Sequence, residues 1–580
     1  MATSPDKTEA IHPEIGPFDN VKIIEPKNKC VEHKKCKYPG FRRNIYDYFT
    51  EFSSNTGIHG FKYMGEQERS FAEKFYWLIL FCISLFFCIY LILQAWLKWD
   101  EPPVLVSFAQ SPTPVWQVPF PAITICSETK TRQRMYNFTN YYHKVIDDMI
   151  IKERNISAAS SLTDEEIQKF SDISLICDNH LYSEGNKTTG FETIEYLISL
   201  APPFEEVFMG CKWTSTNETC NDLFSPMLTE DGICFTFNML DRSELFTNAV
   251  YLHGDYMDHD KRSDGWTLED GYPRVAGKDT FPRRVMSAGS KAGLFLLLRA
   301  YEQDLDYVCR GPVQGFKVWL HDPAEVPRVG TQYFRAPLNQ EIVVAIKPDL
   351  MTTSAGLKNY DPHRRHCFFA QERQLQFFQS YTQQNCQVEC VANYTRTRCG
   401  CVAFHMPHEE STKICGPGSN QCIFEAEQEL LTREVESGLH RFEGDEEDSV
   451  SKTECDCLPA CTSITYNAET SQVDFNWPML FQGFKANFSE FPGIQMTRLT
   501  LFFKDMNFLN SERNEQQLYG QLDFLANCGG LLGVFTGFSF LSIVEIVYFL
   551  SLRLLCNIKK YGVHFWSGSK TLLNDDAYHK

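Results

Sequence analysis

The stretch that decides the fold is an uncharged apolar run of 23 residues, which extends from Phe75 to Leu97 and reads FYWLILFCISLFFCIYLILQAWL. At a helical rise of about 1.5 Å per residue it is long enough to cross a bilayer core of roughly 30 Å. A second apolar run of 29 residues, from Phe524 to Leu552, contains one charge, Glu545. The sequence therefore predicts two membrane spans, and the 426 residues between them, Lys98 to Asp523, form one large domain on one side of the membrane.

Flanking charges indicate which side that domain occupies. Basic residues lie at the ends of the runs that face away from it, namely Lys62, Arg69, Lys74, Arg553, Lys559 and Lys560, and acidic residues lie at the other ends, namely Asp100, Glu101 and Asp523. Cytosolic flanks are enriched in Lys and Arg, so we expect a plasma-membrane protein with a cytosolic region 1–74, a cytosolic tail 553–580 and an extracellular domain. The opening MATSPDKTEA lacks the features of a removable signal peptide, so the first span is expected to direct insertion.

Cysteines and glycosylation sequons agree with an extracellular domain. Sixteen of the 22 cysteines lie between the two runs, an even number that suits disulfides in an oxidising compartment. Every N-x-S/T sequon lies there too, and we expect glycosylation at Asn137, Asn155, Asn186, Asn217, Asn393 and Asn487.

Ten of these cysteines form a string that contains CGC near its middle and CDCLPAC at its end. Their positions are 367, 386, 390, 399, 401, 415, 422, 455, 457 and 461. Zinc binding is the competing interpretation of such close pairs, but an extracellular location opposes it, so no metal site is predicted. A nested ladder of disulfides would tie two antiparallel segments into a rigid lever. Cysteine spacing alone does not give the pairing.

Composition argues against other classes of protein. A formal net charge of −19 and a pI near 5.3 leave no broad basic face for nucleic acid. One local basic cluster in the N-terminal region could lie against anionic membrane lipid, although a solvated tail is the simpler interpretation; it comprises Lys27, Lys29, Lys34, Lys35, Lys37, Arg42 and Arg43. Cys30, His33 and Cys36 have no zinc-finger continuation. We find no HExxH, GxSxG or Walker A motif, so we expect no enzyme and no cofactor.

The large domain combines strand and helix patterns without regular alternation, which predicts an α+β fold. Short strands are predicted by β-branched and aromatic residues at Phe120–Cys126, Gly315–His321, Glu341–Lys347 and Ser463–Tyr466. Helices are predicted by apolar spacing at Glu372–Val391 and Ile423–Gly438. The acidic run Glu443–Asp448 is interpreted as an exposed loop.

An ordered set of landmarks resembles the degenerin and epithelial sodium channel superfamily, which includes the acid-sensing channels, and within it the insect pickpocket channels. The landmarks are IHG at Ile58–Gly60, FPAITIC after the first run, the ten-cysteine string with CDCLPAC, and NCGGLLGVFTGFS at Asn527–Ser539. They occur in family order over nearly the whole chain. The resemblance implies two transmembrane helices (75–97 and 524–552) and an extracellular domain, 98–523, with a β-sheet palm and helical thumb and finger regions.

The resemblance also implies a disulfide pairing. The ladder would join Cys367 with Cys461, Cys386 with Cys457, Cys390 with Cys455, Cys399 with Cys422, and Cys401 with Cys415. The N-terminal part of the domain would join Cys126 with Cys234 and Cys211 with Cys220. Cys177 and Cys309 then remain, and we predict an eighth bridge between them.

The second run is expected to carry the function. Gly529, Gly533 and Gly537 recur every four residues, which on a helix allows close backbone contact with a neighbouring span. Ordinary helix packing would explain the glycines, but not the accompanying Ser539, Ser542 and Glu545. An acidic residue in a span faces a polar path or a partner, or reaches the interface, as Glu545 near the cytosolic end could do.

Individual roles follow from the resemblance. Gly537, Phe538 and Ser539 match the selectivity filter, where backbone carbonyls ring the ion path. Gly533 matches the amiloride-contact position, and Ala526 matches the small residue whose enlargement holds degenerin channels open. His59 and Gly60 match a His-Gly motif in a re-entrant loop under the filter; the alternative is a turn ahead of the first helix. The larger Phe538 stands where acid-sensing channels have a small residue, which bears on sodium over potassium selectivity.

Two spans cannot enclose a pore, so a channel must be a ring of subunits, and the resemblance implies a homotrimer or heterotrimer of related subunits. We therefore expect an amiloride-sensitive channel that conducts sodium ions and has a sensory role in an insect, in which Glu545 lies at the cytosolic mouth of the pore. The stimulus would be osmotic, salty, mechanical or chemical. Alternatives are a two-span scavenger-type receptor that binds lipid and an ATP-gated trimeric channel, but neither requires the glycines or CDCLPAC.

Overall fold

The computed structural model describes residues 40–66, 68–100, 104–153, 162–177, 185–214, 216, 218–254, 256–263, 265–443, 455–485, 492–515, 521–569 and 572. The chain divides into two compact units, which we call the spanning unit (Met1–Trp99 with Tyr519–Lys580) and the disulfide-rich domain (Asp100–Leu518). Several expectations lie outside the described residues, namely those on Lys27 to Lys37, Cys30, His33, Cys36, Asn155, Asn217, Asn487 and most of Glu443–Asp448.

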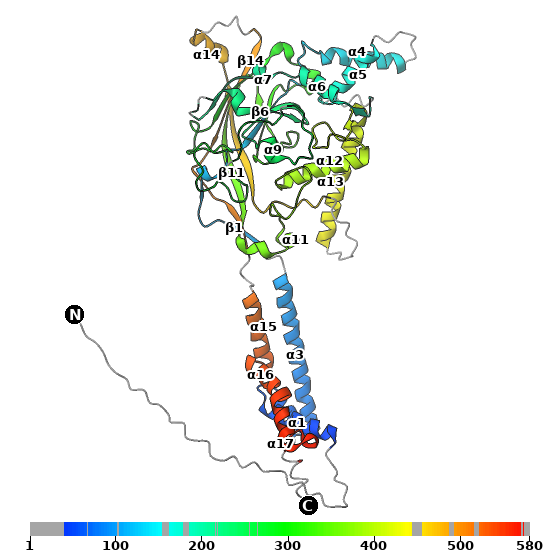
Figure 1. Ribbon diagram of the computed structural model, residues 1–580, viewed down its shortest axis with the longest axis vertical. Coiled ribbons are helices and arrows are strands. Elements are labelled where there is room, and N and C mark those ends of the chain that lie inside the picture. Colours follow the sequence, from blue (N-terminus) through cyan, green and yellow to red (C-terminus); the bar gives the residue numbers. More distant parts are fainter. Residues whose placement is uncertain are drawn as a thin grey trace, which may run out of the picture. The chain divides into compact units, whose positions relative to one another are not determined.

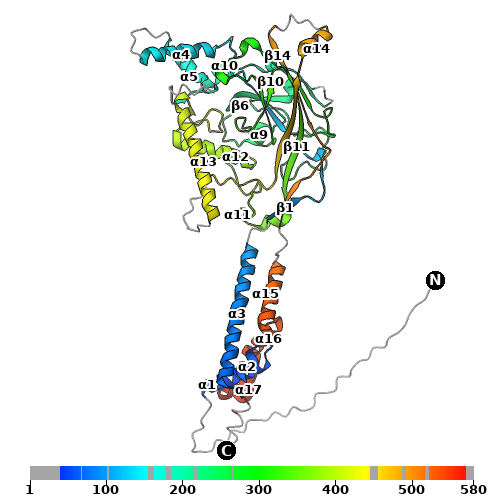
Figure 2. The same ribbon diagram turned by 180° about the vertical axis from the view of Figure 1, so that it is seen from behind.

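The spanning unit consists of helices. Its elements are α1 (Phe41–Asn55), α2 (Phe61–Gly65), α3 (Phe71–Asp100), α15 (Gln521–Thr536), α16 (Phe540–Tyr548), a π-helical turn (Phe549–Arg553), α17 (Leu554–Tyr561) and a 3-10 turn (Val563–Phe565). Two helical stretches, Phe71–Leu97 and Phe540–Tyr561, are long and apolar enough to cross a membrane, and Leu522–Thr536 is a shorter apolar helix. Figures 1 and 2 both show α3 and α15 side by side. The second apolar run is therefore a broken helix that begins three residues before the predicted Phe524.

The disulfide-rich domain is built on two sheets. The first has seven strands in the order β1-β16-β11-β14-β8-β5, with β13 paired to β11, and the second has five in the order β10-β9-β3-β7-β6. The strands of the first sheet are β1 (Val104–Phe108), β5 (Phe208–Trp213), β8 (Leu294–Tyr301), β11 (Gln340–Thr353), β13 (Ser463–Asp474), β14 (Ile494–Phe503) and β16 (Ser511–Glu515). Those of the second are β3 (Ala122–Ser127), β6 (Phe224–Thr229), β7 (Gly232–Phe237), β9 (Gly315–His321) and β10 (Phe334–Pro337).

The largest core cluster of the domain draws buried side chains from both sheets. Residues of β8 alternate between buried and half-buried, as expected for a strand with one face against a core, whereas every residue of β9 is buried. Members of the cluster from the two sheets include Leu296, Val344 and Leu501 on one side and Ile125, Phe237 and Val318 on the other. Four further strands form two small pairs: β2 (Thr113–Pro114) with β15 (Asn507–Phe508), and β4 (Thr188–Thr189) with β12 (Ile414–Cys415).

The longer helices lie on one side of the sheets, in two main groups (Figures 1 and 2). One group packs around a second core cluster and contains α4 (Phe138–Glu153), α5 (Asp164–Ile173) and α6 (Phe191–Leu200). The other is the pair α12 (Gln383–Cys399) and α13 (Asn420–Glu443). Short helices are α7 (Phe204–Val207), α8 (Cys220–Leu223), α9 (Arg242–Leu245), α10 (Tyr307–Arg310), α11 (Pro362–Arg365) and α14 (Trp477–Gly483). The mixed architecture confirms the α+β prediction.

One predicted helix begins in the wrong place. The segment predicted as Glu372–Val391 becomes helical only at Gln383, where Thr382 is the N-cap and accepts a hydrogen bond from the Asn385 backbone. Before it, Phe377 and Phe378 are both buried in a non-helical segment, in which Phe378 forms an isolated antiparallel bridge with Phe246. The second predicted helix is confirmed within α13. Three of the four predicted strands coincide with β9 or fall within β11 and β13. The fourth was predicted to begin two residues before the observed start of β3.

Candidate pore segment

The second apolar run is interrupted at Gly537. This residue has φ +67°, a left-handed conformation that ends α15 after Thr536, and its N–H donates to Gly533 O at 2.9 Å. A side chain at this position would also meet His59, because a Cβ atom built on Gly537 would lie 2.8 Å from the imidazole. Both the backbone conformation and the space therefore require glycine at the first predicted filter position.

The chain re-enters a helix through a capping box. Ser539 is the N-cap of α16, and its hydroxyl accepts a hydrogen bond from the Ser542 N–H at 3.4 Å. Ser542 Oγ in turn accepts a hydrogen bond from the Ser539 N–H at 3.2 Å, and the Ser542 side chain is buried. The serines that ordinary helix packing left unexplained therefore have a local role, since they satisfy N–H groups that begin a helix within the apolar run.

Two consecutive carbonyl groups remain available at the break. The carbonyl of Phe535 accepts a hydrogen bond from Ser84 Oγ on α3 at 2.6 Å, and that of Thr536 accepts one from the His59 N–H at 2.8 Å. Among the described residues, no N–H or O–H group donates to the carbonyl oxygens of Gly537 or Phe538. Unpaired carbonyls in an apolar segment are costly unless they border water, an ion or protein, so these two carbonyls require such a neighbour.

The predicted His-Gly motif lies against this break. The turn between α1 and α2 carries His59 and Gly60, and Gly60 has φ +87° as the N-cap of α2. The His59 backbone bonds to Thr536, and its imidazole occupies the space beside Gly537. Sequence alone left open whether the motif was a simple turn ahead of the first helix. In the structure it is a turn, and it also contacts the break from 477 residues away in the sequence.

Glu545 has a partner in the same turn. Its carboxylate Oε2 accepts a hydrogen bond from the Gly57 N–H at 3.2 Å, and the residue is half-buried. This contact favours the interpretation in which the acidic residue meets a partner over the one in which it only reaches the membrane surface. Glu545 on α16 and Thr536 at the end of α15 therefore hold the same loop from both sides of the break.

Helix α15 presents two different faces. Its contacts with α3 run through Phe524, whose ring centroid lies 5.7 Å from that of Trp96, and through Phe535 eleven residues later. The positions of that face recur three or four residues apart, at Phe524, Cys528 and Leu531. Ala526, Gly530 and Gly533 each follow one of these by two residues, which is a rotation of about 200° and places them on the opposite side of the helix. A Cβ on Gly529 or Gly530 would meet no atom within 4 Å. Packing between the two spans of one chain therefore does not explain the glycines.

Helix α1, before the first span, contacts the π-helical turn Phe549–Arg553 and the segment that follows α17, and we call this contact region the collar. Tyr48 Oη donates to Phe549 O at 2.5 Å, and Glu51 pairs with Arg553. Asn44, which is 1 % exposed, donates to His564 O at 3.0 Å and accepts from Ser567 Oγ at 2.7 Å. Segments before the first span and after the second can pack together only if they lie on the same side of the membrane, which agrees with the predicted topology.

The eight disulfides of the structure are the eight predicted pairs. They are Cys126–Cys234, Cys177–Cys309, Cys211–Cys220, Cys367–Cys461, Cys386–Cys457, Cys390–Cys455, Cys399–Cys422 and Cys401–Cys415. The ladder attaches α12 to the segment before β13 and to the start of α13. Of the sequon asparagines in the described residues, Asn186 is exposed, and Asn137 and Asn393 are half-buried.

Sequence reasoning missed the residues that connect the break to its surroundings. Ser84 is a single hydroxyl in the first apolar run, and Gly57 and Thr536 contribute only backbone groups to their contacts. The serine in an otherwise apolar span was a usable signal, because a hydroxyl there must find an acceptor. Contacts made by backbone groups do not depend on residue type, so the sequence does not indicate them.

A two-span chain with a broken second helix, unpaired carbonyls at the break and a disulfide-braced domain has the features of an ion-channel subunit. Comparison with known proteins agrees: the family model described as amiloride-sensitive sodium channel matches residues 52–549. The chain therefore belongs to the amiloride-sensitive sodium channel family, which is a family of channels and not of enzymes.

Relatives in this family come from insects and vertebrates. The chain is 27% identical to pickpocket protein 28 of Drosophila melanogaster, over 90% of this chain and 81% of the relative. It is 21% identical to the sodium channel protein Nach of the same species, over 92% of each chain. It is also 21% identical to acid-sensing ion channel 4-B of Danio rerio, over 86% of this chain and 75% of the relative. The predicted resemblance is thus confirmed.

Proposed function

We propose that this chain is a subunit of a trimeric, amiloride-sensitive channel of the plasma membrane that conducts sodium ions. The observation that carries the proposal is the break at Gly537 in the apolar run, where two consecutive carbonyls accept no hydrogen bond from any described residue. Three copies of this segment around an axis would present a ring of carbonyl oxygens, which can replace part of the hydration shell of a sodium ion. No cofactor takes part, and the sodium ion is the transported species.

Several features support the assignment of the remaining residues. Ala526, Gly530 and Gly533 share a face of α15 on which Ala526 and Gly530 are exposed, and a Cβ on Gly533 would approach only Phe538 O, at 3.9 Å, among the described residues. This face suits close contact with neighbouring subunits. Gly533 would contact amiloride at the pore, and Ala526 would control the closed packing. His59, Gly60 and Glu545 would support the filter from the cytosolic side. With both termini in the cytosol, the disulfide-rich domain lies outside the cell, where it would receive the stimulus.

The similarity to two pickpocket proteins of an insect underlies the proposal on the stimulus. We propose an osmotic, salt, mechanical or chemical stimulus in an insect, with a homotrimer or a heterotrimer of related subunits as the conducting species. Membrane lipid surrounds the spans. The family assignment removes the basis for the scavenger-type receptor and the ATP-gated channel.

Currents from cells that express the chain test this function. We expect a sodium current that amiloride blocks. A cell in which the chain reaches the surface but amiloride changes no current, with or without coexpressed relatives, would contradict the proposal. Substitutions of Gly533 should change amiloride potency before they change conduction, and equal potency across several Gly533 variants would remove this residue from the blocker site.

A further inference from the structure

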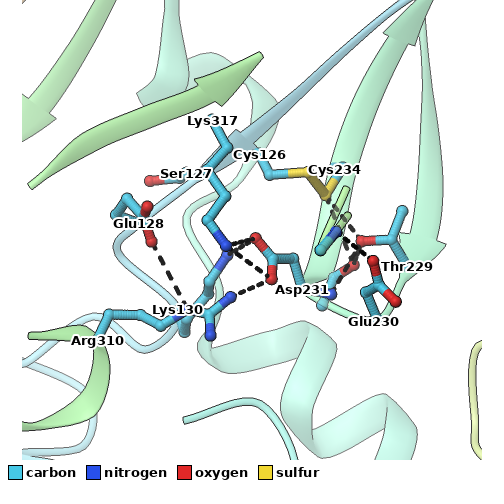
Figure 3. A network of polar contacts seen from close by, with 12 residues as sticks. Cys126, Ser127, Glu128, Lys130, Thr229, Glu230, Asp231, Cys234, Arg310 and Lys317 are labelled. Atoms are coloured by element: carbon cyan, nitrogen blue, oxygen red, sulfur yellow. Dashed lines mark hydrogen bonds and ion pairs between the residues drawn. A yellow bond between two sulfur atoms is a disulfide. The ribbon is translucent and has the colours of Figure 1, made fainter. Parts of the chain in front are cut away.

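Two parts of the disulfide-rich domain place polar side chains beside a cavity. The first is a buried charge cluster, in which Lys130, Arg310 and Lys317 converge on the carboxylate of Asp231 (Figure 3). The cavity beside this cluster holds about 20 Å³, which is room for about one water molecule. The second, which we call the large cavity, holds about 670 Å³. Of the two, the large cavity has a volume that suits a small organic ligand.

The walls of the large cavity are held in place by hydrogen bonds. One wall comes from residues 266–286, in the segment between α9 and β8, and another comes from strands β2, β11 and β13. Arg284 donates to Ala276 O at 2.9 Å and to Gly277 O at 2.6 Å, both within the segment. Its guanidinium also donates to Trp116 O, outside the segment, at 3.0 Å. These bonds fix the segment before any ligand binds, which lowers the cost of binding.

Aromatic rings in the lining favour a flat ligand. Trp116, Trp266 and Tyr272 all line the large cavity, and the ring centroids of Trp266 and Tyr272 lie 6.4 Å apart. Flat rings gain most from a ligand that stacks on them or packs edge-on against them. The guanidinium of Arg284 lies 4.3 Å from the centroid of the Tyr272 ring, so a positively charged ligand at that ring would be repelled. An aromatic ligand here should therefore be neutral or anionic.

The charged side chains of the lining favour an anion. Arg274 and Lys278 are exposed lining residues, and neither forms a hydrogen bond or an ion pair with any described residue. The two acidic lining residues, Glu269 and Asp270, already accept hydrogen bonds, from a backbone N–H and from a hydroxyl group respectively. A ligand carboxylate would therefore meet two cations that have no partner among the described residues, and ionic hydrogen bonds of this kind are strong.

A buried acceptor in the lining adds a second requirement. Asn510 lines the large cavity and is 5 % exposed. Its Nδ2 donates to Thr113 Oγ1, whereas its Oδ1 accepts no hydrogen bond from any described residue. A buried acceptor without a partner is costly, so a ligand that donates one hydrogen bond to Asn510 Oδ1 would remove this cost.

We propose that the large cavity binds a small aromatic carboxylate that also carries one N–H or O–H donor. The aromatic ring packs against the tryptophans of the lining, the carboxylate pairs with Arg274 and Lys278, and the donor bonds to Asn510 Oδ1. Asn510 directly precedes β16, the last strand before α15, so the ligand contacts the chain segment that leads into the second span. Binding itself does not depend on what the channel conducts.

Three related probes test this chemistry on the purified full-length protein, by equilibrium dialysis with the same detergent on both sides. Indole-3-acetate has the ring, the carboxylate and one N–H, and its binding should saturate at one molecule per chain. Indole-3-acetamide lacks the charge and 1-methylindole-3-acetate lacks the donor, so each should bind about tenfold more weakly. Binding of indole-3-acetate that does not saturate, or equal affinity for all three probes, would overturn the proposal.

Variants at exposed positions test the carboxylate contacts without disturbing the core. Arg274→Gln/Lys278→Gln should bind indole-3-acetate about tenfold more weakly and indole-3-acetamide as before, because only the acetate is charged. The matched control is Lys347→Gln/Lys504→Gln, which removes two exposed lysines that do not line the large cavity and should leave both affinities unchanged. Unchanged affinity of Arg274→Gln/Lys278→Gln for indole-3-acetate would reject the site.

A change in the aromatic wall and a brominated probe locate the ligand. Trp116 is 42 % exposed, and Trp116→Ala should weaken the binding of indole-3-acetate and indole-3-acetamide by the same factor, since it removes packing and no charge. Phe424→Ala, which removes an exposed ring on α13, is the control and should change neither. In crystals with 5-bromoindole-3-acetate, an anomalous bromine peak in the large cavity supports the site, and its absence there overturns it.

Discussion

The spanning unit and the disulfide-rich domain hold distant parts of the chain together by different means. In the domain, five disulfides join α12, α13 and the chain around them, and the largest closes a sequence separation of 94 residues. In the spanning unit, the four cysteines of the described residues are all unpaired, and segments almost 500 residues apart meet through hydrogen bonds such as the one from Gly57 to Glu545. The domain is therefore held by covalent bonds, whereas the hydrogen bonds of the spanning unit can break and re-form.

This difference predicts that the two regions respond differently to substitution. Disulfides lower the conformational entropy of the unfolded chain and do not exchange on the timescale of gating, so the ladder keeps α12 and the segments bonded to it in a fixed arrangement. A single hydrogen bond contributes only about 0.5 to 1.5 kcal/mol, so the contacts of His59 and Glu545 can form in one state and be absent in another. Variants of the disulfide-rich domain should therefore mainly lose stability, and variants of the spanning unit should mainly change conduction or gating.

The largest expected effect is in the domain. The double variant Cys386→Ser/Cys457→Ser removes a bridge with a sequence separation of 71 residues. Because the neighbouring bridge Cys390–Cys455 still closes most of that loop, we expect a loss of about 2 kcal/mol in unfolding free energy. We expect a lower Tm of the purified protein and less protein at the cell surface. Cys82→Ser, which changes an exposed free cysteine in the spanning unit, is the control and should leave both unchanged. A double variant with unchanged Tm would contradict the bracing role of the ladder.

Two left-handed glycines compare the regions directly. Gly537 and Gly400 have φ of +67° and +75°, so alanine should cost roughly 1 to 2 kcal/mol at either position. A Cβ on Gly400 would meet nothing within 4 Å, whereas one on Gly537 would meet the His59 ring at 2.8 Å. We expect Gly537→Ala to abolish most of the current or change the sodium to potassium permeability ratio, measured by reversal potential.

Gly400→Ala should lower domain stability and leave permeability unchanged. The added variant His59→Ala makes room for the new methyl group, so the double variant Gly537→Ala/His59→Ala should regain part of the lost current. Normal permeability in Gly537→Ala at normal surface level would show that the break does not select ions.

The next effect concerns the open face of α15. A larger side chain at Ala526 would clash with neighbouring subunits in the closed packing at a cost of typically 1 to 3 kcal/mol. That cost shifts a closed-to-open ratio by roughly 5- to 150-fold, so Ala526→Val should raise the resting current. Leu525→Phe is the control: it adds a larger side chain one residue away, about 100° around the helix, and should not raise the resting current. Ala526→Phe channels with wild-type resting current at the surface would indicate that Ala526 faces lipid.

Much of the disulfide-rich domain could be predicted because its signals are local or carried by residue type. Strand β9 has the predicted bounds Gly315–His321, since a short run of β-branched and aromatic residues between turn formers specifies it. The cysteine pairs followed from family order rather than from spacing. The helix predicted from Glu372 was wrong at its start because Phe377 and Phe378 have an apolar spacing that also suits an extended buried segment.

The residues at the break were singled out from the sequence, but their contacts were not. Gly537 and Ser539 were identified by motif, but the motif does not show why these residue types are needed. Gly537 leaves room for the imidazole of His59, and Ser539 forms a capping box with Ser542. The collar and the charge cluster around Asp231 were missed altogether. Each depends on partners brought together by tertiary structure, for which one sequence offers no periodic signal.

The smallest expected effect tests whether Ser539 acts on ions or only begins a helix. Loss of an N-cap costs about 1 kcal/mol, and both Ser539→Ala and Ser542→Ala break the same capping box. Ser542 is buried, whereas Ser539 is exposed in the single chain beside the unpaired carbonyls. We therefore expect a modest loss of current in both variants, but a changed reversal potential in sodium and potassium solutions in Ser539→Ala alone. Ser539→Thr, which keeps a hydroxyl cap, should preserve the current. If the two alanine variants shift the reversal potential equally, the serines act by capping α16, and ion selection depends on the backbone at Gly537 and Phe538.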